Sequence, residues 1–284
     1  MSTQSKRLSG YVCVVTGASR GVGRGMAVAL GAEGATVYMT ARTVDPGGGR
    51  GSLLETAKEI TDRGGDARPV RCDHTADEDV RALFERVEAE SGKCDLLVNN
   101  VFATPGGDLF NTPFWKQPID VWDTMIDVGL RSHYVASALA VPLLLKSEGG
   151  LIANVSSFGG ASYQVNVAYG VGKAGVDRLA RDMARDLRDH GVCSVSLYPG
   201  VVRTEKVLAG ELPYSTEVSE SPEFAGRVVT ELLLDGQRMK KTGKVHVVAE
   251  LARDYGVLDV DGTQPPSLRE LAAERRAKKK ETAS

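Results

Sequence analysis

The sequence contains no apolar run that approaches the roughly 18 residues needed to span a bilayer. Residues 1–10 are polar and lack the apolar region of a secretory signal peptide. Charge of one sign is not in excess either, because 35 Lys and Arg stand against 37 Asp and Glu, for a net charge of -2. A strongly basic surface for nucleic acid is therefore not indicated. We expect a cytoplasmic protein that binds neither membranes nor nucleic acid.

Cysteine is scarce, with four residues at Cys13, Cys72, Cys94 and Cys193. They form no C-x-x-C pair and show no metal-like spacing with the four histidines, so no metal site is expected. Three of them lie in or beside apolar runs, where a thiol serves as a small buried hydrophobe. We therefore expect free, buried thiols, as is typical of a reducing compartment.

What the sequence does contain is an alternation of short apolar runs with longer amphipathic stretches. This alternation, in 284 residues of ordinary globular composition, predicts a parallel sheet covered by helices on both faces. The predicted fold is a single-domain α/β fold of the Rossmann type, with a doubly wound parallel seven-stranded sheet flanked by helices. The strands are expected at residues 11–16, 36–40, 67–72, 95–99, 151–155, 193–197 and 245–248, and the helices at residues 21–33, 53–63, 76–91, 119–145 and 169–190.

Three segments stand apart from this alternation. Residues 44–52 are rich in glycine and predict a loop. Residues 201–225 follow a strand end and lack periodicity, which favours a substrate lid on a catalytic domain of residues 1–262. Residues 263–284 are polar and basic, with a run of five cations at positions 275–280, and are expected to form a solvated tail. These cations are Arg275, Arg276, Lys278, Lys279 and Lys280.

A glycine-rich turn joins the first predicted strand to the first predicted helix. Gly17 permits a tight turn, Gly21 lets the backbone approach a pyrophosphate, and Gly23 allows close helix–strand contact. The helix N-terminus then presents free amides to an anion. Glycines alone could mark a plain turn, but this strand–turn–helix context favours nucleotide binding. The expected nucleotide contacts in this turn are Gly17, Ser19, Arg20, Gly21, Val22 and Gly23.

The second predicted strand ends at Ala41 and is followed by Arg42, where an acidic residue would favour NAD(H). Two guanidiniums, of Arg20 and Arg42, suit a 2′-phosphate instead. The sequence therefore favours NADP(H) over NAD(H), the alternative being that Arg42 is a solvated loop residue.

Tyr169 and Lys173 are spaced i, i+4, which places them on one face of a helix. An ammonium beside a phenol stabilises the phenolate, so we expect the pKa of Tyr169 to be lowered from its free value near 10, which would allow proton exchange with an alcohol near neutral pH. Ser156 and Ser157 end the preceding strand, where a hydroxyl could bind the substrate oxygen.

These motifs together resemble the short-chain dehydrogenase/reductase family. The glycine turn, Asn99-Asn100, Ser157, the Tyr169/Lys173 pair and Pro199-Gly200 occur in that family's order and spacing, over roughly residues 8–250. The resemblance implies an oxidoreductase that moves a hydride between a nicotinamide and a small carbonyl or alcohol substrate.

The resemblance also implies roles for individual residues. Tyr169 would be the general acid/base, Lys173 would modulate its pKa, and Ser157 would orient the carbonyl. The helices at 119–145 and 169–190 would pair across subunits, giving a homodimer or homotetramer. Further cofactor contacts are implied at Asp73 and His74 for the adenine, Asn100 for the ribose, Tyr169 and Lys173, and Pro199, Gly200, Val202 and Thr204 for the nicotinamide.

The sequence departs from the family pattern at four places, one of which is Ala249-Glu250, where Asp-Gly-Gly is usual after the last predicted strand. Val101 and Phe102 stand where Ala-Gly is usual, and Gly129 stands where the family has a catalytic Asn. The spacing to Tyr169 leaves open whether Ser156 or Ser157 faces the site; we expect Ser157, because turn residues follow it. The departure at Gly129 keeps a second hypothesis open, a nucleotide-binding regulator with weak or no turnover. A third is another reaction at the same site, such as enoyl reduction or dehydration.

Aromatic residues and histidines outside these motifs allow two interpretations. Phe110, Phe114, Trp115 and Trp122 follow the fourth predicted strand and could line a substrate pocket or pack in the core. His133 and His246 lie in apolar segments, where hydrogen-bonded core histidines are expected.

Overall fold

The computed structural model describes residues 6–47, 51–106 and 108–281. The first half of the polar N-terminal stretch (1–5), residues 48–50 of the glycine-rich loop and the last three residues of the predicted tail lie outside the described residues, as do the side chains of residues 279–281.

Seven parallel strands form one sheet in the order β3-β2-β1-β4-β5-β6-β9. The order reverses between β1 and β4, which is the switch point of a doubly wound sheet. The predicted fold class and all seven predicted strands are confirmed. The strands are β1 (Val12–Thr16), β2 (Thr36–Ala41), β3 (Asp66–Arg71), β4 (Leu96–Asn99), β5 (Leu151–Val155), β6 (Cys193–Tyr198) and β9 (Val245–Val247).

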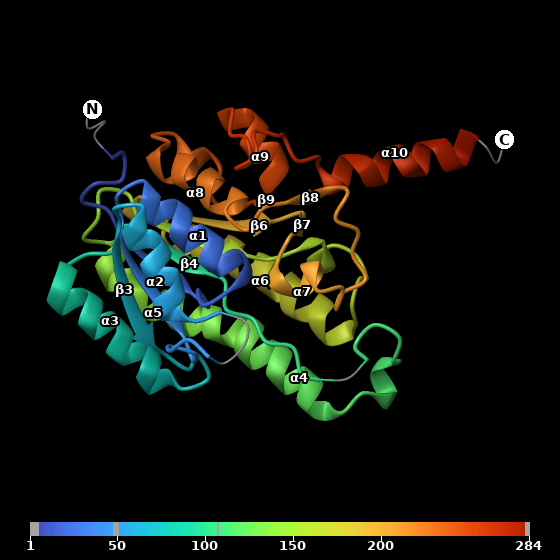
Figure 1. Ribbon diagram of the computed structural model, residues 1–284, viewed down its shortest axis with the longest axis horizontal. Helices are drawn as coiled ribbons and strands as arrows, with labels where there is room; N and C mark the ends of the chain where they lie inside the picture. The colour runs from blue at the N-terminus through green and yellow to red at the C-terminus, as the bar shows by residue number, and fades with distance from the viewer. Residues whose placement is uncertain (1–5, 48–50, 107, 282–284) are drawn as a thin grey trace.

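Helices cover both faces of the sheet (Figure 1). One layer contains α1, α2 and α8, with α1 packed against both of the others; the other contains α3, α5 and α6. The main helices are α1 (Gly21–Ala32), α2 (Leu53–Asp62), α3 (Asp77–Ser91), α4 (Ile119–Ile126), α5 (Ser132–Leu144), α6 (Val167–Asp186), α8 (Phe224–Leu234), α9 (Val248–Tyr255) and α10 (Leu268–Glu281).

The apolar run of β1 shows why the strands are apolar throughout. Cys13 and Val15 pack into the core beneath α1 and α8, whereas Val12 and Val14 pack into the core beneath α3 and α5. Successive side chains of a strand point to opposite faces. Because both faces are covered, neither set of alternate positions is free to be polar.

The helix predicted at 119–145 has the expected extent but is not continuous. It consists of α4, a π-helical turn η2 (Asp127–Arg131) and α5, with the buried Gly129 inside the π turn. A π turn adds a residue to the helix without changing its apolar periodicity enough to be visible in the sequence.

The segment predicted as a lid, 201–225, is built from short elements that sequence periodicity could not resolve. These are β7 (Val201–Val202), which pairs with β8 (Ser219–Glu220), and the one-turn helix α7 (Glu205–Leu208) between them. The helices α8, α9 and α10 were not predicted.

Much of the expected solvated tail is helical, as α10. In Figure 1 this helix extends away from the sheet. Its first turns are tied to α9 by ion pairs of Arg269 with Glu250 and of Arg253 with Glu270.

The four cysteines are free and buried, as expected. Among the described residues, no helix is long and apolar enough to cross a membrane. In the same part of the chain, no cluster of three or more His, Cys, Asp or Glu side chains is placed to hold a metal ion.

The α1–α8 contact depends on glycines. A Cβ at Gly25 would lie 2.0 Å from the carbonyl of Pro222, and one at Gly226 would lie 2.6 Å from the Cα of Met26. Helix α1 therefore meets α8 and the residues just before it at backbone distance, and this contact fixes α8 against α1.

We expect Gly25→Ala to destabilise the protein by about 1–3 kcal/mol, because the two helices must separate to admit the methyl group. The better helix propensity of alanine, worth about 1 kcal/mol, opposes this loss but is too small to reverse it. Thermal unfolding measures the difference. Gly236→Ala is the matched control, since its Cβ would meet nothing within 4 Å; equal melting temperatures for both variants would contradict the contact.

Candidate active site

The glycine turn after β1 packs against the segment that follows β4. Gly17 has φ +69°, and a Cβ there would lie 2.9 Å from the Cα of Val101. A Cβ at Gly23 would lie 2.4 Å from the carbonyl oxygen of Gly17. Both positions thus require glycine, one for its backbone angle and contact and the other for contact alone.

Asn100 braces this turn from the next strand. Its Nδ2 donates to the carbonyl oxygens of Thr16 (2.8 Å) and Gly17 (3.2 Å), and its backbone amide donates to Thr16 Oγ1 (2.9 Å). The carboxyl ends of β1 and β4 are therefore held together at the switch point of the sheet. The Asn100 side-chain amide thus donates to the protein backbone. Its contact with the cofactor ribose, implied by the family resemblance, remains a prediction.

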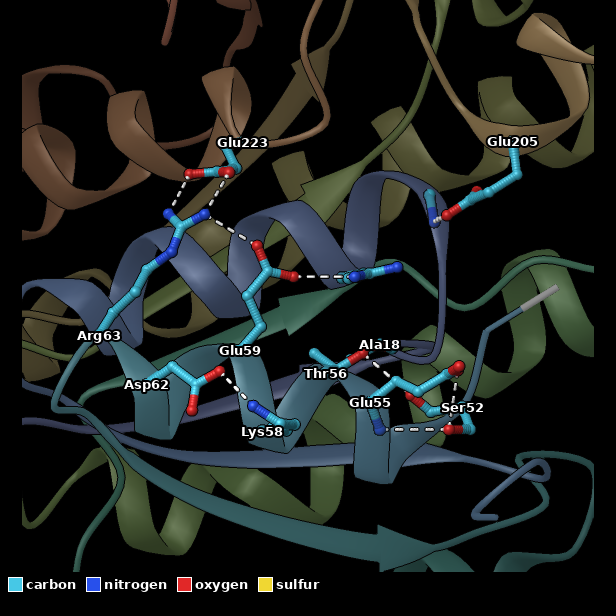
Figure 2. A network of polar contacts seen from close by, with 12 residues as sticks. Ala18, Ser52, Glu55, Thr56, Lys58, Glu59, Asp62, Arg63, Glu205 and Glu223 are labelled. Carbon is cyan, nitrogen blue, oxygen red and sulfur yellow. Dashed lines mark hydrogen bonds and ion pairs between the residues drawn. The ribbon is translucent and has the colours of Figure 1, made fainter. Parts of the chain in front are cut away.

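The start of α1 already binds an oxyanion. The amide of Gly21 donates to both carboxylate oxygens of Glu205, at 3.1 and 3.3 Å, and Figure 2 shows this carboxylate pointing at the first turn of α1. Thr204, the N-cap of α7, lies beside the same glycine. The amide end of α1 can thus bind a negatively charged group, and a dinucleotide phosphate there would take the place of this carboxylate. Glu205 was not predicted, although it directly follows Thr204 in sequence.

Helix α2 supports the glycine turn through a hydrogen bond. Thr56 on α2 donates to the carbonyl of Ala18 (3.0 Å). Arg63, near the end of α2, pairs with Glu223, which precedes α8 (Figure 2). The first contact ties α2 to the glycine turn, and the second ties the end of α2 to the residue before α8.

Arg20 and Arg42 are exposed, and within the described ranges neither makes an ion pair. Although burial raises the pKa of Asp73, hydrogen bonds from Thr75 and the charge of Arg42 hold it below its usual value. His74 is buried, and its Nε2 lies 2.7 Å from Thr40 Oγ1. Burial lowers the pKa of His74 to about 4, so its ring is neutral and turned into the protein.

Ser157 rather than Ser156 faces Tyr169. The Tyr169 hydroxyl donates to Ser157 Oγ at 2.8 Å. Ser156 is buried, and its hydroxyl donates instead to the carbonyl of Lys173. Two local features position the pair: Ser157 comes just after β5, and Tyr169 lies in the first turn of α6, where its amide donates to the N-cap side chain of Asn166 (2.8 Å).

Lys173 lies one turn further along α6. Its Nζ donates to the carbonyl oxygen of Val155 at 3.0 Å and lies 6.0 Å from the centre of the Tyr169 ring. Burial lowers the pKa of Lys173 to about 8, against the opposing charge of Asp177. Burial also raises the pKa of Tyr169, against the hydrogen bond with Ser157. The expected lowering of the Tyr169 pKa by Lys173 was therefore wrong, because the effect of burial is larger; the phenol is neutral at pH 7 and able to donate a proton.

Pro199 and Gly200 follow β6 at the same edge of the sheet. A buried carboxyl lies behind them: a Cβ at Gly200 would be 2.8 Å from Glu220 Oε2, and the Gly200 amide donates to this carboxyl. Val202 is held beside it by the pairing of β7 with β8. Sequence reasoning missed Glu220, because a two-residue strand gives no periodic signal.

The segment from Ser219 to Ser221 is anchored by Asp259. This buried carboxylate accepts hydrogen bonds from the Ser221 amide (2.7 Å) and hydroxyl, and it pairs with Arg203 at 3.2 Å. The chain beyond β9 therefore holds down the segment that was predicted to be a lid.

The aromatic residues and histidines divide between the predicted alternatives. Phe110 meets Tyr214 edge-on at 6.5 Å, but Phe114, Trp115 and Trp122 are exposed and belong to no core cluster.

His133 is buried with Nε2 on the Val101 carbonyl (3.1 Å), and its Nδ1 has no partner among the described residues. The expectation of a fully hydrogen-bonded core histidine was wrong for this nitrogen.

Comparison with known proteins places this arrangement in a family. The family model for short chain dehydrogenases matches residues 11–209, which contain the glycine turn, Ser157, Tyr169 and Lys173. The chain belongs to the short-chain dehydrogenase family. The resemblance predicted from sequence is confirmed, and the chain is an oxidoreductase of a family that binds nicotinamide cofactors.

Curated relatives support the assignment. Mouse dehydrogenase/reductase SDR family member 1 is 44% identical over 271 residues, which cover 90% of this chain and 85% of the relative. The 7alpha-hydroxysteroid dehydrogenase of Escherichia coli K12 is 29% identical over 72% of this chain and 76% of its own length.

Solved structures show the same fold. A metagenomic short-chain oxidoreductase in complex with NADP is 32% identical, with a TM-score of 0.66 over 81% of this chain and 93% of its own. A short chain dehydrogenase from Mycobacterium thermoresistibile is 25% identical, with a TM-score of 0.76 over 92% of this chain and 93% of its own.

Glu220 gives the site a measurable pH dependence. Burial raises the pKa of Glu220 to about 8, helped by Asp259 and opposed by Gly200 and Arg203. An unfolded glutamate titrates near 4.3, so the stability that the protonated carboxyl contributes is present below about pH 4 and is lost as the pH rises to about 8.

We therefore expect Glu220→Gln to match the wild type near pH 4 and to exceed its stability at pH 9 by about 2–4 kcal/mol. Chemical denaturation at both pH values measures this difference. Glu217→Gln, on an exposed residue of the same segment, is the control and should leave the pH dependence unchanged. Parallel stability curves for wild type and Glu220→Gln would show that Glu220 is ionised in the folded protein.

Proposed function

We propose that this protein is an NADP(H)-dependent oxidoreductase that interconverts a small carbonyl compound and its alcohol, with Tyr169 as the general acid/base. The observation that carries the proposal is the 2.8 Å hydrogen bond from Tyr169 to Ser157 beside the buried ammonium of Lys173. These groups lie at the carboxyl ends of the strands, where open α/β sheets bind their ligands.

The roles of the side chains follow from their contacts. When bound, the nicotinamide supplies or accepts the hydride. In reduction, the Ser157 hydroxyl holds the carbonyl oxygen, and the Tyr169 hydroxyl gives its proton to that oxygen as the alcohol forms. The Lys173 ammonium then stabilises the phenolate that remains. Oxidation of the alcohol reverses each proton movement.

The residues at the glycine turn fit a phosphorylated dinucleotide. The Gly21 amide already donates to an oxyanion, and the exposed Arg20 and Arg42 supply two cations for a 2′-phosphate. The similar metagenomic oxidoreductase was solved with NADP, which supports the same choice here. Proposed contacts elsewhere are Ser19, Val22, Gly17 and Gly23 in the turn, Asp73 and the His74 backbone, Asn100, Tyr169 and Lys173, and Pro199, Gly200, Val202 and Thr204.

We further propose a homo-oligomer and a cytoplasmic location. The α5 and α6 surfaces leave Tyr134, Val167 and Val171 exposed, and a second copy would cover them. Four free thiols suit a reducing compartment.

We expect Tyr169→Phe to reduce turnover of a panel of ketones and quinones by about 10²–10⁴-fold, because the general acid is removed. Binding of NADPH, followed by its fluorescence, should persist. The control is Tyr134→Phe, on the exposed face of α5, which should keep wild-type turnover. A Tyr169→Phe enzyme that retained full activity would exclude Tyr169 as the acid; wild type that binds NADPH but reduces no substrate would favour a regulator.

Arg42→Ala should raise the KM for NADPH by about 10–100-fold while changing that for NADH little, since a charge-assisted contact to the 2′-phosphate is lost. Steady-state kinetics with both cofactors measure the ratio. Arg178→Ala, an exposed arginine of α6 paired with Asp182, is the control for removing a positive charge. Equal losses with both cofactors would place Arg42 away from the 2′-phosphate.

A further inference from the structure

Phe102 occupies the space beside Gly129. A Cβ at Gly129 would lie 2.8 and 3.0 Å from the Cδ2 and Cε2 atoms of the Phe102 ring, so this ring fits only against a residue without a side chain. Gly129 lies in the π turn η2, and Phe102 follows β4. The segment after β4 and the π turn η2 are thus complementary in shape where Phe102 meets Gly129.

The same ring covers Lys173. The Lys173 Nζ lies 4.9 Å from the centre of the Phe102 ring, within the range of a cation–π contact, and Phe102 meets Tyr169 edge-on at 5.7 Å. Among the residues that the structure describes, the one hydrogen-bond acceptor of Lys173 Nζ is the carbonyl of Val155. The face of the Phe102 ring therefore covers a side of the Lys173 ammonium that water could reach if the ring were absent.

We propose that Phe102, seated over Gly129, is the positioning residue that seals the Lys173 ammonium from water beside Tyr169 and offsets part of this desolvation with its π face. The inference rests on the proposed function, in which Lys173 stabilises the Tyr169 phenolate. Phe102 itself exchanges no proton; it acts through Lys173.

The other groups that face Lys173 do not replace this contact. Asp177 lies one turn away on α6, and its negative charge favours the ammonium; its oxygens also accept hydrogen bonds from Ser196 and Tyr198. His133, on α5, has its pKa lowered to about 3 by burial and by the charge of Lys173, so it is neutral. Tyr169 is neutral at pH 7, since burial raises its pKa.

The ring has two opposing effects on Lys173. By excluding water it favours the neutral amine, and by presenting its π face it favours the ammonium. Replacing the ring with an aliphatic group of similar bulk removes only the second effect. Truncating the ring removes both and lets water reach the ammonium.

Phe102→Leu should therefore lower the pKa of Lys173, and Phe102→Ala should raise it, each by about 0.5–1 unit. Gly129→Ala, which displaces the ring without changing it, should shift the pKa in the same direction as Phe102→Ala. Phe102→Tyr, which keeps the ring, should restore the wild-type value. A residue that merely fills space would not shift the pKa in opposite directions.

The measurement is an NMR pH titration of protein labelled with [¹³C]lysine, read at the Cε of Lys173 and assigned by its absence in Lys173→Arg. Thermal unfolding of each variant establishes that it is folded. Opposite shifts for Leu and Ala support the proposal. Shifts of the same sign, or titration at the wild-type pH in both, overturn it.

The pH profile of turnover separates this inference from the proposed function. In an active enzyme, the alkaline limb near pH 8 should move with the pKa of Lys173 in each variant. If the titration shifts as expected but wild type has no turnover, the positioning role stands and the proposed reaction fails. If turnover is normal while the titration does not shift, Phe102 is only packing.

Discussion

Parallel pairing of β1, β4, β5 and β6 is the constraint on which the site depends, because it brings their carboxyl ends to a single edge of the sheet. The glycine turn, Asn100, Ser157 and Gly200 each begin within two residues of the end of one of these strands. None needs a long loop to reach its place, so the register of the sheet sets the distances between them. The helices contribute the remaining groups from their first turns, as α6 does with Tyr169 and Lys173.

The buried ammonium of Lys173 imposes a second requirement. A fully desolvated lysine is costly unless its charge is compensated, and the shift of its pKa to about 8 measures that cost. The structure offsets part of it with the Val155 carbonyl, the Phe102 ring and the more distant Asp177. At neutral pH these contacts keep the ammonium the majority form, which is what phenolate stabilisation requires. A neutral amine would give Tyr169 no such assistance.

The sheet and the principal site could be predicted because their signals are local in sequence. A buried parallel strand is a short apolar run, a phosphate turn is a strand followed by spaced glycines, and Tyr169 with Lys173 is a spacing of four on one helix. What could not be predicted depends on contacts between distant segments. Glu220 is buried by Gly200 and the chain near Asp259, and α8 meets α1 through glycines whose role is visible only when both helices are placed.

The departures from the family pattern at positions 102 and 129 illustrate the same limit, because in the sequence they are two unrelated differences. In the structure they compensate each other. Any residue larger than glycine at position 129 would displace the ring, because a Cβ there already lies 2.8 Å from it. A small residue at position 102 would leave the glycine facing an unfilled space next to the ammonium. Each change is unfavourable by itself, and together they place a packed aromatic face over Lys173. The absence of an asparagine at position 129 is therefore weak evidence against catalysis in this chain, because the Lys173 ammonium is still buried, held by the Val155 carbonyl and close to Tyr169.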